Sequence, residues 1–233
     1  MVGDSCRVTP HAGEARCDTV VEGIGRSRRR RLVMLAAERA RDPKIIEKLA
    51  ADGTDFNLCG DEGYSPLDFA AVHNPNPEVV RAIMKAALGP DPQDDDIEVY
   101  VLMAAGSNPS PKVLAVLLES GFDPDHGRWT IDDLLRAAAV ENTNPEVVKT
   151  LLARGAEIDS RDENGMTPLM KAAMRNRNPE VIMTLLRAGA DPSLRSYDDM
   201  TAFDYMKLFN GNMERWDNRV WQIVREACSQ RGD

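Results

Sequence analysis

The chain has 233 residues, and although 42% of them are hydrophobic, only 5% are aromatic, so any core must consist mainly of aliphatic side chains. Its formal net charge is −9. Residues 1–31 hold seven Arg against four acidic residues, which leaves 22 basic and 34 acidic residues in 32–233. Because affinity for nucleic acid depends largely on Lys and Arg that neutralise phosphates, this acidic body argues against nucleic acid as the main partner, and none is expected. It favours a protein partner with a basic surface.

The four cysteines, Cys6, Cys17, Cys59 and Cys228, are widely separated and form no Cys-x-x-Cys pair. We therefore expect neither a disulfide framework nor a zinc ribbon, and we expect a reducing, cytoplasmic setting. The sequence has no run of about 18 apolar residues that could cross a membrane. It also lacks the apolar segment of a secretory signal near its beginning. No contact with a membrane is expected.

Residues 1–28 are polar, contain four glycines and show neither the period of a strand nor that of a helix. We expect them to form a disordered N-terminal extension. The basic run Arg28–Arg31 ends this segment. It is either a solvated lead into the first helix or a basic address signal or nucleic-acid patch, and the sequence leaves both open.

From residue 29 onwards the sequence repeats with a period of 34 residues, which prolines mark. The residue before each proline is a good helix N-cap, so each pair predicts the start of a helix. These pairs are Asp42-Pro43, Asn76-Pro77, Ser110-Pro111, Asn144-Pro145 and Asn178-Pro179, and Asn212 keeps the cap without a proline. Alanine pairs at the same period predict an earlier, closely packed helix in each unit. Glycines are expected to end the later helix at Gly53, Gly121, Gly155 and Gly189, and Ala87 interrupts that series.

A period of 34 fits two helical-hairpin repeats, the tetratricopeptide and the ankyrin repeat. Tetratricopeptide units need large aromatic residues that this chain lacks. The segments 162–169, 147–152 and 189–191 instead resemble the ankyrin repeat, as do 63–67 and 155–157. The resemblance covers residues 29–228 and implies an all-α solenoid of paired antiparallel helices with short β-turn fingers. The extra residue falls in the turn between the helices, where Asn-Pro-Glu-Val replaces the usual Gly-His-x-Glu-Val, similar to some bacterial ankyrin proteins.

We expect about six repeat units in residues 29–228, followed by a C-terminal tail, residues 229–233. The units are 29–57, 58–91, 92–125, 126–159, 160–193 and 194–228. The first unit lacks the Gly-x-Thr-Pro-Leu start, and the last unit has lost its proline and its Leu-Leu pair. We interpret both as caps, because terminal units must cover the core on one side and face water on the other.

The third and fourth units depart from the pattern at their start. Asp95 and Thr130 can each begin a capping box with an acidic residue three positions later, Glu98 and Asp133 respectively. We therefore expect the first helix of both units to start about three residues early. Both units lack the glycine that a β-turn finger needs. A gap in the row of fingers is expected there.

No pattern in the sequence indicates a catalytic or metal centre. His11, His73 and His126 lie in separate segments, and no His-x-x-x-His, Gly-x-Ser-x-Gly or phosphate-binding loop occurs. The acidic run 91–98 lacks the glycine that a calcium loop has at its sixth position. We expect no enzymatic activity, no metal and no cofactor.

The resemblance implies that a partner binds the concave side, on the finger tips and the exposed face of each first helix. We expect Met166 at a finger tip, with Tyr64 and Met200 at the same position of other units, as adaptable apolar contacts. Trp129 either fills the gap between the fingers or contacts the partner. The other expected contact residues are Asp61, Glu62, Asp68, Asn74, Glu163, Arg175, Tyr197 and Asp198.

By resemblance, the expected function is that of a non-catalytic protein–protein interaction module or scaffold, acting as a monomer. One alternative is a targeting or regulatory subunit of a bacterial effector or toxin-neutralising system. Another is a structural element that stacks end to end through Trp216 and Trp221.

Overall fold

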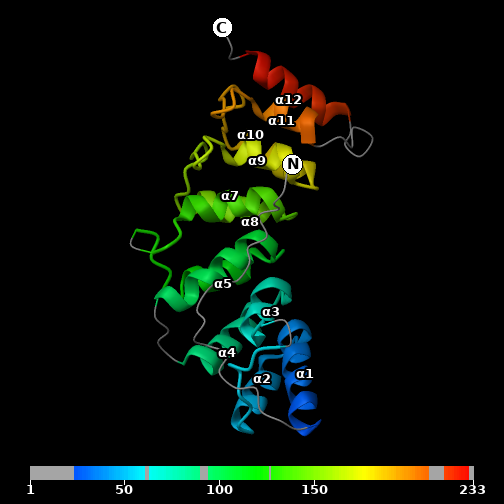
Figure 1. Cartoon of the computed structure of the whole chain (residues 1–233), viewed down its shortest axis with the longest axis vertical. Helices are drawn as coiled ribbons and strands as arrows, with labels where there is room; N and C mark the ends of the chain where they lie inside the picture. The colour runs from blue at the N-terminus through cyan, green and yellow to red at the C-terminus, as the bar shows by residue number, and fades with distance from the viewer. Residues whose placement is uncertain (1–23, 61–62, 90–93, 126, 210–217, 231–233) are drawn as a thin grey trace.

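A computed structural model describes residues 24–60, 63–89, 94–125, 127–209 and 218–230. These residues form helices without a β-strand, and the helices stack in chain order along one axis (Figure 1). They are α1 (Ile24–Arg39), α2 (Pro43–Ala51), α3 (Pro66–His73), α4 (Pro77–Leu88), α5 (Asp94–Ser107), α6 (Pro111–Leu118), α7 (Ile131–Glu141), α8 (Pro145–Ala153), α9 (Pro168–Arg175), α10 (Pro179–Arg187), α11 (Ala202–Phe209) and α12 (Asn218–Gln230). Helix α1 begins five residues before the expected start of the repeats, and residues 1–23 of the expected extension lie outside the described residues.

The helices form two layers, because each unit contributes a first helix and a second helix. The first helices, α1, α3, α5, α7, α9 and α11, pack against one another in order, more closely than the second helices do. Small side chains permit this close approach: the alanine pairs of α3, α5, α7 and α9 are fully buried between neighbouring first helices. The all-α repeat solenoid expected from the sequence is confirmed.

The predicted N-caps mostly form. The side chains of Asp42, Asn76, Asn144 and Asn178 accept a hydrogen bond from the backbone N–H two residues later. Ser110 makes no such bond, and Asn212 lies outside the described residues. The expected glycine stops adopt positive φ. In the second unit, α4 continues past Ala87 and ends at Gly89, whose φ is 86°, so the stop is displaced by two residues rather than lost.

A ladder of buried asparagines ties each turn between helices to the preceding unit. Its members are Asn74, Asn108, Asn142 and Asn176. Asn142 is typical: its Nδ2 donates to the carbonyls of Ala105 at 2.9 Å and Asn108 at 2.8 Å, and its Oδ1 accepts from the N–H of Asn144 at 2.9 Å. Each amide thus satisfies three backbone groups that would otherwise be left without partners at helix ends.

Asn74 is therefore not a surface residue, contrary to the sequence-based prediction. Its side chain is 0% exposed and donates to the carbonyls of Ala37 and Ala40 at 2.8 and 3.0 Å. Its position at the end of α3 places it in the asparagine ladder. Its side chain is therefore not accessible to a partner.

Cys59 corrects a second expectation. It is disulfide-bonded, although the spacing of the cysteines indicated no disulfide. The cysteine pattern therefore gives no support for a reducing compartment, and the cytoplasmic location stays a prediction. Among the described helices, none is long and apolar enough to span a membrane.

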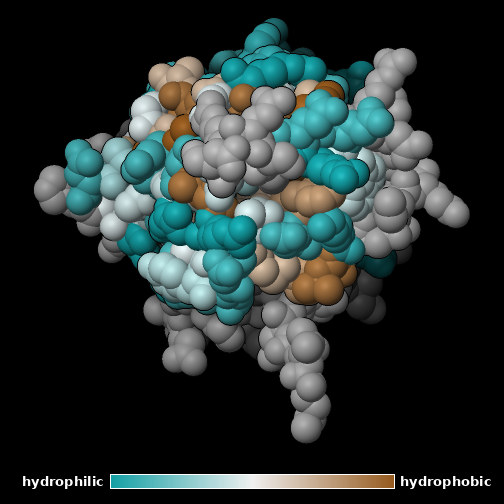
Figure 2. All heavy atoms as spheres, turned by 90° about the horizontal axis from the view of Figure 1, so that it is seen from above, coloured by the Kyte–Doolittle hydropathy of each residue, from teal (hydrophilic) through white to brown (hydrophobic). Residues whose placement is uncertain are grey.

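The C-terminal end of the stack is closed by α12. Trp221 is buried there, and its ring meets that of Phe203 edge-on with the ring centroids 6.1 Å apart. Viewed from above, down the long axis of the molecule, the surface is mainly hydrophilic with scattered hydrophobic side chains (Figure 2). Trp221 thus serves the core of its own chain, which weakens the end-to-end stacking alternative; Trp216 lies outside the described residues.

Candidate functional site

Among the described residues, three turns form β-turn fingers that project from the stack, each immediately before a first helix. They are Gly60–Tyr64, Asp162–Met166 and Ser196–Met200, and in each the first residue's N–H donates to the carbonyl of the last, at 2.7, 3.1 and 3.0 Å. Gly63 and Gly165 hold the left-handed position of the first two turns, with φ of 82° and 70°. Asp199 takes that position in the third, with φ of 59°. We call the side of the stack that carries these turns the finger edge.

The third and fourth units have no finger, because their first helices occupy that part of the chain. Counted by the period from Pro66, these helices would begin at residues 100 and 134, but α5 begins at Asp94 and α7 at Ile131. The early start of α7 and the capping box of Thr130 with Asp133 agree with expectation. The predicted capping role of Glu98 is wrong, because α5 starts earlier still and Glu98 lies within it. The gap in the row of fingers is present.

A loop closes the core at this gap. Glu98 is only 2% exposed, and its two carboxylate oxygens accept from the N–H of Arg128 at 2.8 and 2.9 Å. Gly127 fits tightly beside it, since a Cβ there would lie 1.8 Å from Glu98 Oε1. Trp129 is half-buried and packs against the core, with the Arg128 guanidinium 5.5 Å from its ring centroid. Trp129 fills the gap in this arrangement, and part of its ring stays on the surface.

The finger of the second unit borders a hollow on the near side of the gap. The hollow measures about 280 Å³ and is lined by Tyr64, Asp68, Phe69, Val72, His73 and Met103. The rings of Tyr64 and Phe69 meet edge-on with centroids 6.1 Å apart, and Met103 comes from α5 of the next unit. A largely apolar cleft with the carboxylate of Asp68 and the imidazole of His73 in its wall therefore lies between two units.

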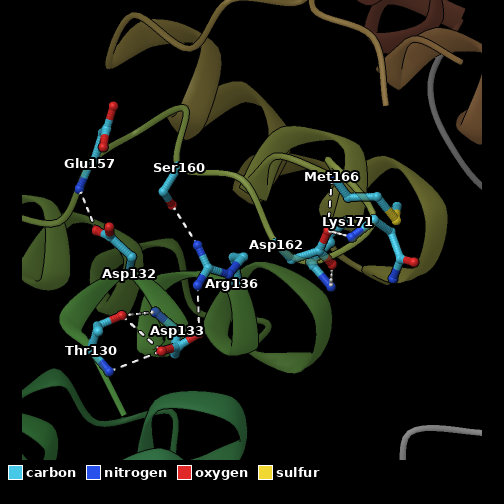
Figure 3. Close-up of polar contacts among 10 residues, drawn as sticks. Thr130, Asp132, Asp133, Arg136, Glu157, Ser160, Asp162, Met166 and Lys171 are labelled. Atoms are coloured by element: carbon cyan, nitrogen blue, oxygen red, sulfur yellow. Dashed lines mark hydrogen bonds and ion pairs between the residues drawn. The ribbon is translucent and has the colours of Figure 1, made fainter. Parts of the chain in front are cut away.

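Polar contacts hold the far side of the gap, between α7 and α9. Arg136 reaches from α7 to Asp133 and to Ser160 Oγ, the latter at 2.9 Å (Figure 3). Asp162 holds its finger: its carboxylate accepts from the N–H of Met166 at 2.8 Å and pairs with Lys171 Nζ at 2.7 Å. Asp133, Arg136, Asp162 and Lys171 thus have partners within the chain, which fixes the shape of this part of the edge.

The fifth and sixth units have fingers that bind each other. The Tyr197 N–H donates to the Asn164 carbonyl at 3.1 Å. The Arg161 guanidinium donates to the carbonyls of Gly165 and Arg195 at 3.1 and 2.7 Å. The Tyr197 ring lies over Gly165, where a Cβ would come within 2.8 Å of it. The side chain of Tyr197 nevertheless stays 75% exposed, the most exposed large hydrophobic residue in the described part of the chain.

Four carboxylates of the finger edge differ in their titration. Burial raises the pKa of Asp133 and of Asp162, but hydrogen bonds and the paired cations Arg136 and Lys171 outweigh it and hold each pKa below its usual value. The hydrogen bond from Thr201, opposed by burial and helped by Lys207, lowers the pKa of Asp204. Burial raises the pKa of Asp68, and the bonds from Ser65 do not offset it. Asp68 is thus the carboxylate of this group that the fold stabilises least.

The remaining predicted contact residues divide by exposure. Glu163, Arg175, Tyr197 and Asp198 are exposed, whereas Tyr64, Asp68, Trp129 and Met200 are half-buried. Met166 is only 7% exposed and belongs to the core, so the prediction of an exposed tip is wrong there. The finger turns back toward the core at that position, and the exposed tip is formed by the residues before the glycine. Asp61 and Glu62 lie outside the described residues.

Two features of the site escaped the sequence analysis. Phe69 and Met103 line the hollow, but nothing in the repeat pattern separates them from core residues. The asparagine ladder, in contrast, has a signal in the sequence, since its members recur every 34 residues, two positions before each N-cap. Among the described residues, no group of three or more His, Cys, Asp or Glu side chains could hold a metal ion.

Comparisons with known proteins agree with this architecture. Residues 134–207 match a family model described as ankyrin repeats, in three copies. No curated protein matches the sequence.

Two solved structures share the fold. One match is to a chain of the predatory endopeptidase Bd0816 from Bdellovibrio bacteriovorus in complex with immunity protein Bd3460, with 23% identity and a TM-score of 0.55, covering 85% of this chain and 97% of that one. The other is the ankyrin repeat protein EF0377, with 24% identity and a TM-score of 0.55, covering 85% of this chain and 96% of that one. The family model shows ankyrin repeats in residues 134–207, and the likeness to the solved structures shows that the fold over 85% of the chain is that of an ankyrin repeat protein.

Proposed function

We propose that the chain is a non-catalytic module that binds a protein partner along its finger edge. Ankyrin repeats are protein–protein interaction modules, and the repeats account for nearly all of the described residues. The fold itself does not determine which surface is used. The choice of the finger edge rests on the exposed groups that it presents.

The interrupted row of fingers is the observation that carries this proposal. On one side of the gap lies the hollow beside Tyr64, and on the other lies the exposed ring of Tyr197. Tyrosine is enriched in the contact regions of protein interfaces, because its large ring has few rotatable bonds and carries a polar group. The opposite edge, where the helices turn, uses its asparagine side chains to bind backbone within the chain.

Partner capture with matched variants tests this proposal. The tagged full chain is used to isolate proteins from a lysate of its source organism, with quantitative mass spectrometry of what is retained. Tyr64→Ala and Tyr197→Ala should each lower the recovery of the same partner. Lys149→Ala, an exposed change on α8 in the second-helix layer, should leave recovery unchanged. A partner that is lost with Lys149→Ala but kept by both tyrosine variants would place the contact surface on the other layer.

A second candidate is that the chain neutralises an effector or toxin by binding it. The similarity to a chain from the endopeptidase–immunity protein complex supports this candidate, although at 23% identity it concerns the fold. The captured partner should then be an enzyme whose activity falls when the wild-type chain is added and recovers with Tyr197→Ala. A partner without enzymatic activity, or one whose activity is unchanged in the complex, would leave only the scaffold function.

Monomeric behaviour is part of the same proposal. We propose that the chain acts as a single copy, since Trp221 is buried in its own core. Light scattering should give the mass of one chain over a wide range of concentration. A mass that rises with concentration would instead support end-to-end stacking.

A further inference from the structure

Asp68 occupies an unusual place in the wall of the hollow. It is the third residue of α3, and one of its oxygens, Oδ2, accepts from the N–H of Ser65 at 2.6 Å in a capping box. The same carboxylate lines the hollow with the rings of Tyr64 and Phe69. No cation of the described residues contributes to its titration. Asp68 is thus a half-buried carboxylate that forms no ion pair with any of the described residues.

The sixth unit shows a related arrangement in which a cation is present, although its ring, Phe203, lies at the repeat position of Leu67 and not of Tyr64 or Phe69. Asp204 lies at the position of Asp68, four periods later, and forms a similar cap through Thr201. There, Lys207 Nζ lies 3.7 Å from Asp204 Oδ1 and 4.3 Å from the ring centroid of Phe203. One ammonium group therefore satisfies both the cap carboxylate and the face of an aromatic ring.

The second unit has no lysine at the corresponding position. The position that corresponds to Lys207 is Ala71, which is 0% exposed. A lysine there would have to enter the packed interface between α3 and α5, whereas α11 has no further first helix above it in the described residues. The second unit therefore has the carboxylate and two rings from other positions, Tyr64 and Phe69, but no lysine at the position of Lys207.

We propose that the hollow beside Tyr64 is a socket for one lysine or arginine side chain of a protein partner. The charged head would lie between Asp68 and the rings of Tyr64 and Phe69. The ammonium of Lys207 makes the same two kinds of contact in the sixth unit, with a carboxylate and with a ring from another repeat position. The apolar stem of such a side chain would contact Val72 and Met103, which line the same hollow. This inference rests on the proposed function and specifies the chemistry of one contact within it.

Size and charge both fit this occupant. The hollow of about 280 Å³ lies just below the range of roughly 300–1,000 Å³ that is usual for small-molecule pockets, which suits a single long side chain. The net charge of −9 attracts a basic partner surface. A neutral apolar side chain would fill the hollow but leave Asp68 without a counter-ion.

Small probes test the socket on the full chain. The probes are lysine amide and arginine amide, each acetylated on the α-nitrogen so that the side chain keeps its charge. Norleucine amide, acetylated in the same way, is the uncharged control. Binding is followed in spectra of the chain with ¹³C-labelled methionine methyl groups, where Met103 reports on the hollow and Met183, on α10, reports on a distant site. The two cationic probes should shift the Met103 signal in a saturable manner at millimolar concentrations, and norleucine amide should not.

Matched variants identify the groups responsible. Asp68→Asn keeps an acceptor for the Ser65 N–H but removes the charge, so it should weaken lysine binding by roughly three- to tenfold, as for a partly exposed ion pair with a cation–π contact. Asp204→Asn should not change it, because Lys207 already occupies that site. Tyr64→Leu removes one ring without touching the cap and should also weaken binding. It keeps the test valid if Asp68→Asn fails to fold.

Some results would overturn the socket. Equal shifts with norleucine and lysine probes would show an apolar site only, and no shift at tens of millimolar would show no site. Unchanged lysine binding by Asp68→Asn would exclude the carboxylate. If partner capture still depends on Tyr64 and Tyr197 while the lysine probe fails, the proposed function stands and the socket is wrong. If the lysine probe binds but neither tyrosine change affects partner capture, the hollow does bind a cation, but the proposed function of the finger edge is wrong.

Discussion

The two edges of this solenoid are built from the same 34-residue unit but differ in regularity. At the edge where the helices turn, the asparagine ladder repeats without interruption from Asn74 to Asn176 with nearly constant distances. At the finger edge, the second, fifth and sixth units have a finger, while the third and fourth begin their first helices early instead. One edge is thus uniform and the other is varied.

The difference suggests a division of roles: the asparagine ladder stabilises the stack, and the finger edge is proposed to recognise a partner. The asparagine side chains of the ladder form hydrogen bonds with backbone groups of the preceding unit, so they are not available to bind a partner. The finger edge leaves the Tyr197 ring exposed and the half-buried Asp68 carboxylate in the wall of the hollow. In repeat proteins, stability depends on each interface between neighbouring units, whereas the exposed groups can differ from unit to unit without affecting those interfaces.

The largest expected effect comes from breaking the ladder. Asn142→Ala would leave two carbonyls and one N–H without their partners, and each buried unsatisfied group costs about 1–3 kcal/mol. We therefore expect the free energy of unfolding to fall by about 3 kcal/mol. Urea unfolding followed by circular dichroism measures this change.

An asparagine of the finger edge serves as the matched control. Asn164 is exposed, and its backbone rather than its side chain makes the bond to Tyr197. Asn164→Ala should change stability by no more than about 0.5 kcal/mol. Equal losses in the two variants would show that the edges do not differ in their contribution to stability.

The next effect concerns the loop that closes the gap. In Gly127→Ala, the added Cβ would lie 1.8 Å from Glu98 Oε1 and 2.6 Å from the Asp123 carbonyl, so the loop must shift. We expect a loss of about 1–3 kcal/mol, as for overpacking of a filled site. Gly106→Ala in α5 is the control, because its Cβ would meet only Glu141 Oε2 at 3.8 Å and alanine favours a helix by up to about 1 kcal/mol. If Gly127→Ala is as stable as wild type, the loop at Gly127 is not tightly packed against Glu98.

A smaller effect should appear in the pH dependence of stability. The folded pKa of Asp162 is lowered by its partners, so its contribution is complete above about pH 4 and is lost as the pH falls through the folded pKa. Asp162→Asn should therefore be less stable than wild type at pH 7, with a difference that shrinks in acid. Urea unfolding at a series of pH values measures both.

Asp68 should behave in the opposite way. Because burial raises its folded pKa, its contribution to stability is lost as the pH rises from about 4 through that pKa. Asp68→Asn should consequently be at least as stable as wild type at pH 7, since asparagine still accepts from the Ser65 N–H. A clear loss of stability at pH 7 in Asp68→Asn would mean that the charge already has a partner within the chain.

The sequence predicted the repetitive part of this molecule well. Prolines, caps and glycines at a fixed period act locally, so the helix starts at Pro43, Pro77, Pro145 and Pro179 and the missing fingers of the third and fourth units followed from residue types alone. The finger of the sixth unit is harder to predict from the sequence, because the left-handed position of its turn is occupied by Asp199 and not by the usual glycine.

The candidate site was predicted less well, because it depends on packing between units. Met166 and Tyr64 occupy the same repeat position, yet Met166 enters the core and Tyr64 lines a hollow next to a unit without a finger. Asn74 was predicted to lie on the surface, but the preceding unit packs against it and buries it. Local patterns do not carry this information, since it depends on residues about 34 positions away.

The smallest effect on stability, and the most informative one for function, is expected at Tyr197. Its side chain is 75% exposed, so Tyr197→Ala should change the free energy of unfolding by no more than about 0.5 kcal/mol. The backbone bond from Tyr197 to Asn164 is kept, so the two fingers should stay joined. Thermal unfolding measures the first point, and hydrogen exchange of the Tyr197 amide measures the second. A variant that is stable and keeps this amide protected, yet binds the partner less well, would assign recognition to the exposed ring. If the variant instead loses several kcal/mol, Tyr197 belongs to the stabilising part of the fold, and the distinction between the two edges fails there.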